Sequence, residues 1–254
     1  MNTEKLLKVW IDGSPVGTLA QEGRKQYVFG YDSRATEGVS LTMPVRLQSW
    51  ISEDLHPIFQ MNLPEGALLE AIRRAIAKIS GDDDLSILLA TGGNQVGRNS
   101  FTSGDERLLA TGGKKESLEE LLTYPDTKEL FHELLNRYAL RSGVSGVQPK
   151  VLLDATERGT LTSSGYIVKT WGEDYPQLAA NEYFCMTAAK KADLPVPEFR
   201  LADNGGFFIM RRFDQTADDK SMGFEDMCSL QALGTAQKYR GTYERVAKSL
   251  KEFV

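Results

Sequence analysis

The order of apolar segments in the second half of the chain constrains the fold most strongly. Residues 151–153 form an apolar run, and residues 165–170 show the β-branched and aromatic pattern of a second strand. Residues 177–192 have the length of a helix and are followed by residues that end helices, and residues 206–213 begin as a third apolar strand. Residues 151–153 and 165–170 look like paired strands across the polar connection 154–164, so this order predicts a small sheet accompanied by one helix.

A loop rich in small residues, 141–150, precedes this sheet. Gly143 and Gly146 give its backbone unusual freedom, and the loop ends at Lys150. Several N–H groups of such a loop can point at one place, which is how proteins hold phosphate. The loop matches neither of the two common glycine-rich phosphate patterns, so by itself it also fits an ordinary turn into a strand.

Two charged residues stand among apolar ones in the predicted sheet and helix. Lys169 alternates with apolar residues along its strand, and Glu182 has apolar neighbours on its helix face. A buried ammonium group needs a counter-charge, so each residue is the obvious partner of the other. A strand lysine paired with a helix glutamate beneath a small-residue loop is the phosphate-holding arrangement of protein kinases. The alternative is that both side chains lie on the surface.

The first half predicts a small sheet followed by helices. We expect a hairpin of strands 9–11 and 16–19 joined by the turn residues 12–15, and further strands at 27–31 and 40–44. We also expect helices at 64–79, 85–90 and 128–140, and a helix-capping box at 117–120. The break at 124–127 suggests two domains, residues 1–125 and 126–254. The predicted class is α+β, with a small N-terminal sheet and helical subdomain followed by a kinase N-lobe-like antiparallel sheet.

Charge and composition exclude several classes of function. The net charge of −5 argues against a surface devoted to nucleic acid, and the basic stretch 238–251 reads as a solvated amphipathic helix. No run approaches the ~18 apolar residues of a membrane span, and early charges disfavour a secretion signal, so we expect a cytoplasmic protein. Two distant cysteines and two histidines give no metal-ligand spacing, so no metal site is expected within the chain.

The motifs resemble a known family. Segments 141–153, 166–169, 181–186, 194–197, 211–214 and 225–228 resemble successive motifs of the HipA-type serine/threonine kinases, the toxins of bacterial HipBA toxin–antitoxin modules. Residues 63–65 and 84–88 resemble the N-terminal subdomain of that family. The similarity extends over nearly the whole chain.

The resemblance implies roles for particular residues. The ATP-phosphate loop would comprise Ser145, Gly146, Val147, Gln148, Pro149 and Lys150. Lys169 would reach the phosphates with Glu182 as its ion-pair partner, and Arg211, Arg212 and Phe213 would form the hinge that receives adenine. Arg211 stands where the family often has glutamate. Gly143 stands where the family has its autophosphorylated serine, so Ser142 or Ser145 would be the modified residue.

The resemblance also implies partners and cofactors. These are ATP with Mg²⁺, a HipB-like antitoxin, and an aminoacyl-tRNA synthetase as protein substrate. The sequence contains neither H-x-D-x-x-x-x-N nor D-F-G, so we expect the catalytic aspartate and the Mg²⁺ ligands outside this chain, and the C-terminal catalytic lobe to be absent. This chain alone would then be inactive as a kinase. The alternative is a non-catalytic module that pairs with an antitoxin or with a separate kinase lobe.

Overall fold

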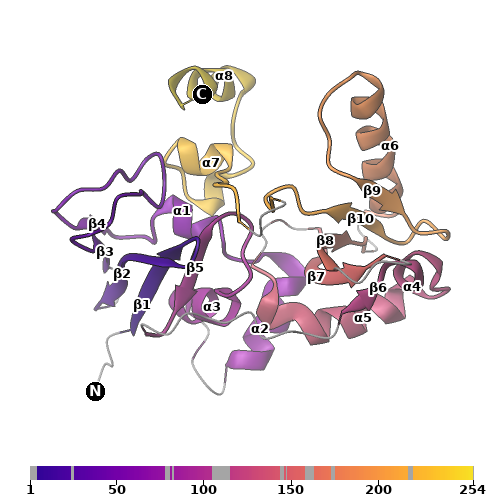
Figure 1. The fold of residues 1–254 in the computed structure, drawn as a ribbon, viewed down its shortest axis with the longest axis horizontal. Coiled ribbons are helices and arrows are strands. Elements are labelled where there is room, and N and C mark those ends of the chain that lie inside the picture. Colours follow the sequence, from indigo (N-terminus) through magenta and orange to yellow (C-terminus); the bar gives the residue numbers. More distant parts are fainter. Residues whose placement is uncertain are drawn as a thin grey trace.

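The chain forms two five-stranded sheets with helices between and around them (Figure 1). The computed structural model describes residues 5–23, 26–77, 81, 83–104, 115–143, 146, 148–157, 163–172, 175–216 and 220–253. Helices and strands alternate irregularly along the chain, which confirms the predicted α+β class. No helix in these ranges combines the length and the apolar character that crossing a bilayer requires.

The first sheet is antiparallel and has the order β4-β3-β2-β1-β5. Its strands are β1 (Lys5–Ile11), β2 (Ser14–Glu22), β3 (Gln26–Tyr31), β4 (Trp50–Ser52) and β5 (Asn99–Thr102). Asp12 and Gly13 join β1 to β2 with φ of 47° and 75°, the left-handed conformation that a tight Asp-Gly hairpin turn requires. The strand predicted at 40–44 is wrong. Ser40 and Met43 bridge to each other in a tight turn, and the edge strand is β4.

A layer of helices connects the two sheets: α1 (Pro57–Gln60), α2 (Gly66–Ile76) and α3 (Asp84–Thr91). Helix α3 is apolar on more than one face because it lies in two cores. Its Leu85 and Leu88 pack with the first sheet, whereas Ile87 packs with the second. Asp83 caps α3 by accepting a hydrogen bond from the Ser86 amide, and the predicted helix at 85–90 is confirmed.

The second sheet has the order β6-β7-β8-β10-β9. Its strands are β6 (Glu116–Ser117), β7 (Lys150–Thr156), β8 (Ser163–Lys169), β9 (Phe199–Leu201) and β10 (Phe208–Arg211). All neighbours are antiparallel except β6 and β7. The helices α4 (Leu118–Thr123), α5 (Thr127–Tyr138) and α6 (Leu178–Lys191) accompany this sheet. Ser117 caps α4 through the Glu120 amide, as the capping box predicts. The domain boundary after residue 125 stays a prediction, although β6 already belongs to this sheet.

The last part of the chain returns to the first half. The short helix η1 (Ala139–Arg141) lies between α5 and β7 in the sequence. After the second sheet the chain forms α7 (Met227–Leu230), η2 (Thr235–Gln237) and α8 (Tyr243–Phe253). The Glu225 carboxylate accepts hydrogen bonds from Ser40 Oγ at 2.8 Å and from the Leu41 amide at 2.7 Å. The Thr235 amide donates to Gln60 Oε1 at 2.8 Å. In Figure 1, α7 accordingly lies beside α1, away from β9 and α6.

Candidate functional site

The predicted strand-to-helix ion pair is present in the structure. Lys169 ends β8, Glu182 lies in the second turn of α6, and the lysine Nζ donates to Glu182 Oε1. The two side chains are only 17% and 24% exposed, so the pair is partly shielded from water. The Phe208 ring lies 5.6 Å from the ammonium group and adds a cation–π contact. Lys169 is thereby held in a defined position at the end of its strand.

A second lysine lies directly opposite the first. Lys150 begins β7, and the antiparallel register pairs it with Lys169, so the two side chains leave the same face of the sheet. Lys150 is 8% exposed. Burial and, after it, the nearby charge of Lys169 lower the pKa of Lys150 from 10.5 to about 8. Two neighbouring ammonium groups in a shielded place repel each other, and an anion between them relieves that repulsion.

The end of the glycine-rich loop is fastened beside these lysines. Gly146 has φ of 114°, a backbone conformation that favours glycine, and it lies against the Lys150 ammonium group. Gln148 Nε2 donates to the Thr170 carbonyl at 3.1 Å, and the Thr170 amide donates to the Pro149 carbonyl at 2.9 Å. The described end of the loop is therefore bonded to Thr170 beside the sheet, and Gly146 lies next to the Lys150 ammonium group. Ser145 and Val147 lie outside the described residues.

Ser142 has a structural position in this conformation. It is fully buried, its Oγ accepts from the Leu152 amide at 2.9 Å, and it donates to the Tyr138 carbonyl at 2.8 Å. The hydroxyl therefore links the last residue of α5 to strand β7, and it is not exposed to a nucleotide. Phosphorylation of Ser142 stays a prediction, and it requires the residue to leave this buried place.

Arg212 is part of a buried network, and this differs from the role expected of its side chain in a hinge. Its Nε and Nη2 donate to the two carboxylate oxygens of Asp214 at 3.0 and 2.6 Å, and the pair is 4% and 0% exposed. The guanidinium also donates to Asn94 Oδ1 and to the Gln95 carbonyl. The Gly97 amide donates to Asp214 at 2.8 Å. The network joins the turn at 94–97 to the end of β10, and its guanidinium has no face turned to solvent.

The other two hinge candidates differ in exposure. The Arg211 side chain is exposed, and its amide donates to the Glu198 carbonyl at 2.8 Å. Phe213 is 36% exposed, and its ring meets the edge of Phe224 with ring centroids 5.3 Å apart. Adenine contact by residues 211–213 therefore stays a prediction that depends on the Phe213 ring and on backbone groups.

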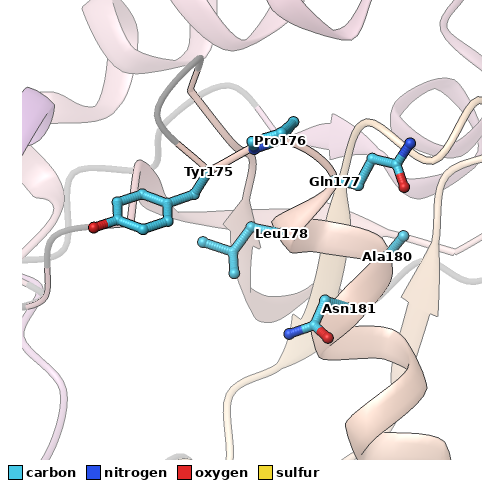
Figure 2. A pocket seen from close by; sticks show the side chains of 6 residues that line it. All are labelled: Tyr175, Pro176, Gln177, Leu178, Ala180 and Asn181. Atoms are coloured by element: carbon cyan, nitrogen blue, oxygen red, sulfur yellow. The ribbon is translucent and has the colours of Figure 1, made fainter.

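A surface hollow at the start of α6 is separate from the lysine pair. Figure 2 shows its lining, which is Tyr175, Pro176, Gln177, Leu178, Ala180 and Asn181. Gln177 precedes the helix with φ of 60°, and none of the lining residues is charged. Among the described residues, no group of three or more His, Cys, Asp or Glu side chains is arranged to hold a metal ion.

Comparison with known proteins matches both halves of the chain to one family. Residues 7–102 match the model described as HipA N-terminal domain, and residues 142–254 match the model described as HipA-like C-terminal domain. "Putative kinase Y4mE" of Sinorhizobium fredii is 26% identical over 257 residues, covering 91% of this chain and 60% of the relative. A Haemophilus influenzae protein named "Putative kinase" is 30% identical over 122 residues, 41% of this chain and 36% of the relative.

A solved structure shares the fold. The HipA chain in the Shewanella oneidensis complex of HipA, HipB and operator DNA superposes with a TM-score of 0.63 at 19% identity, over 93% of this chain and 59% of that one. This chain thus spans about 60% of the length of Y4mE and of the Shewanella HipA chain. The expectation that the C-terminal catalytic lobe is absent is wrong, because residues 142–254 match the model described as HipA-like C-terminal domain.

Proposed function

Because the chain belongs to the HipA family, we propose that it supplies the ATP-binding part of a HipA-type serine/threonine kinase toxin. The observation that carries the proposal is the pair of opposed lysines, Lys150 and Lys169, with Glu182 holding the second. A protein kinase holds nucleotide phosphates with a strand lysine and a helix glutamate in this relation. The names of the kinase relatives support the same assignment.

The residues present suit a nucleoside triphosphate with Mg²⁺. Lys150 and Lys169 would hold phosphate oxygens, and backbone groups near Gly146 would lie beside them. Mg²⁺ supplies additional charge neutralisation when the phosphoryl group is transferred, and its protein ligands are proposed to lie outside this chain. The contribution of this chain is to bind and orient the phosphates and to fix the position of Lys169 through Glu182.

The partners follow from the family. The Shewanella HipA was solved with HipB and operator DNA. We propose a HipB-like antitoxin as the protein partner here, with an aminoacyl-tRNA synthetase as the phosphorylated substrate. Direct contact between this chain and nucleic acid is not part of the proposal.

A second candidate is a non-catalytic module that pairs with an antitoxin or with a separate kinase lobe. The absence of H-x-D-x-x-x-x-N and D-F-G from the 254 residues favours it. Affinity capture of the tagged chain from the source cell, followed by mass spectrometry, addresses this candidate. Co-purification of a polypeptide that carries the two missing motifs supports it, and a chain that phosphorylates a protein without any such polypeptide contradicts it.

Calorimetric titration with ATP and Mg²⁺ tests the main proposal. We expect the wild type to bind and Lys169→Met to bind at least about tenfold more weakly, because a charge-assisted phosphate contact is lost. The matched control is Lys190→Met, which removes an exposed lysine from the last turn of the same α6 helix that carries Glu182. Equal ATP affinity of the wild type and Lys169→Met would contradict the proposal.

A further inference from the structure

The returning C-terminal part places a third lysine against the first half of the chain. Lys238 Nζ lies 3.2 Å from Glu65 Oε1 and 3.7 Å from Asp226 Oδ2. The Tyr239 hydroxyl donates to Glu65 Oε2 at 3.3 Å. Glu65 stands at the N-cap of α2, yet its side chain caps no backbone amide of that helix. Its carboxylate is instead engaged by residues 173 and 174 positions later in the chain.

These groups belong to the surroundings of the lysine pair. The charges of Glu65 and Lys238, like those of Lys169 and Glu182, contribute to the shifted pKa of Lys150, so these groups lie near its ammonium group. The Lys238 and Glu65 side chains are 19% and 20% exposed, so solvent screens them only in part. We define the charge cluster as three lysines and three acids. Its members are Lys150, Lys169, Lys238, Glu65, Glu182 and Asp226.

The formal charges of this cluster cancel in the protein without nucleotide. A bound triphosphate adds several negative charges to it, so one or more carboxylates must then lose a favourable contact or face repulsion. Glu182 stays bonded to Lys169 from its own sheet-bound helix. Glu65 reaches the cluster from the N-terminal half, where it contacts Lys238 and the Tyr239 hydroxyl of the C-terminal part.

We infer that Glu65 is a built-in competitor for nucleotide phosphate. This inference rests on the proposed ATP site. Without nucleotide, Glu65 occupies Lys238 and offsets the positive charge around Lys150. When phosphates bind, Lys238 exchanges the Glu65 carboxylate for a phosphate oxygen, which loosens the contact between α2 and the segment that carries Lys238. Nucleotide binding is thereby coupled to the junction between the two halves of the chain.

The substitution Glu65→Gln distinguishes a competitor for phosphate from an ion pair with a purely structural role. If the pair only joins the two halves, Glu65→Gln lowers stability and leaves phosphate affinity unchanged or weaker. If Glu65 competes, Glu65→Gln tightens the binding of a polyanion. Removing one negative charge from this partly shielded cluster corresponds to a gain of about three- to tenfold in affinity for the polyanion.

The experiment is a calorimetric titration of the folded full chain with inorganic triphosphate at low salt. Wild type, Glu65→Gln, Lys238→Met and Glu70→Gln are compared, and circular dichroism verifies folding. Glu70→Gln is the matched control because Glu70 is an exposed glutamate on the same helix. We expect about three- to tenfold tighter binding for Glu65→Gln, weaker binding for Lys238→Met, and no change for Glu70→Gln.

The outcomes separate this inference from the ATP site itself. Binding by the wild type, with equal or weaker binding by Glu65→Gln, overturns the competitor role alone. Measurable binding by Glu65→Gln and none by the wild type supports the competitor role. Absence of binding in both chains overturns the competitor role together with the proposed phosphate site.

Discussion

Replacing Lys150 with methionine should stabilise the protein while it removes phosphate binding. Burial and the charge of Lys169 hold the pKa of Lys150 at about 8 instead of 10.5, so the charged form is disfavoured in the folded state. At 1.36 kcal/mol per pH unit, this difference corresponds to roughly 3 kcal/mol. Methionine keeps an unbranched apolar chain of similar length in the same buried place and removes the charge. We therefore expect Lys150→Met to unfold with a free energy higher by about 1 to 3 kcal/mol at pH 7.

The stability gain of Lys150→Met should depend on pH in a direction set by the lowered pKa of Lys150. The folded-state pKa is lowered, so the folded chain binds fewer protons than the unfolded chain between pH 8 and 10.5. The destabilisation of the wild type is complete below pH 8, declines as the pH rises through that window, and vanishes above it. Urea unfolding of both proteins at pH 7 and pH 9.5 measures the difference. A Lys150→Met protein that is no more stable than the wild type at pH 7, or a gain that does not shrink at pH 9.5, refutes the reasoning.

Three further predictions follow from the same contacts. Binding of ATP should raise the pKa of Lys150 from about 8, so calorimetry at pH 8 in buffers of different ionisation enthalpy should show uptake of up to about half a proton, and zero uptake would count against a phosphate at Lys150. Asp214→Ala should lower the free energy of unfolding by about 3 to 5 kcal/mol, because it removes the carboxylate that pairs with the buried Arg212. Asp203→Ala, at an exposed position, should lower it little. Equal losses in the two variants, measured by denaturant unfolding, would contradict a stabilising role of the Arg212–Asp214 network. Ser142→Ala should cost about 1 to 3 kcal/mol, because the buried Leu152 amide loses its acceptor, and a stability equal to that of the wild type would show that the hydroxyl is dispensable.

Local sequence patterns predicted those parts of the fold that depend on neighbouring residues. The Asp12-Gly13 turn requires two positive φ values that this dipeptide favours, and the capping box at Ser117 needs only residues three apart. The meeting of Lys169 with Glu182 could be inferred because Lys169 alternates with apolar residues, Glu182 has apolar neighbours on its helix face, and each charge needs a partner. In each case the energetic reason is contained in a short stretch of sequence.

The parts that the sequence did not reveal depend on distant partners. Strands β6 and β9 have two and three residues, too few for a periodic signal, and they exist because β7 and β10 supply their hydrogen bonds. Segment 40–44 resembles a strand, but a hydrogen bond from the Met43 amide to the Ser40 carbonyl closes it into a turn.

The site residues that sequence reasoning missed show the same limit. The Arg212 guanidinium donates to Asn94, which lies 118 positions earlier in the sequence, and Lys238 donates to Glu65, which lies 173 positions earlier. The opposite charges two residues apart at Arg212 and Asp214, directly after an apolar strand, were the local signal for the first network. No local signal joins Lys238 to Glu65.

The most direct test of the phosphate site is labelling with an acyl phosphate derivative of ATP. A lysine amine next to the bound phosphates attacks the acyl carbon, the bond from that carbon to the phosphate oxygen breaks, and ATP leaves as the amide forms. Because Lys150 has a pKa of about 8, a larger fraction of its amine is uncharged at neutral pH than in an ordinary lysine. The account predicts that peptide mass spectrometry finds the label on Lys150 and Lys169 and that excess ATP blocks it. Label confined to exposed lysines such as Lys190, and unchanged by ATP, would contradict the account.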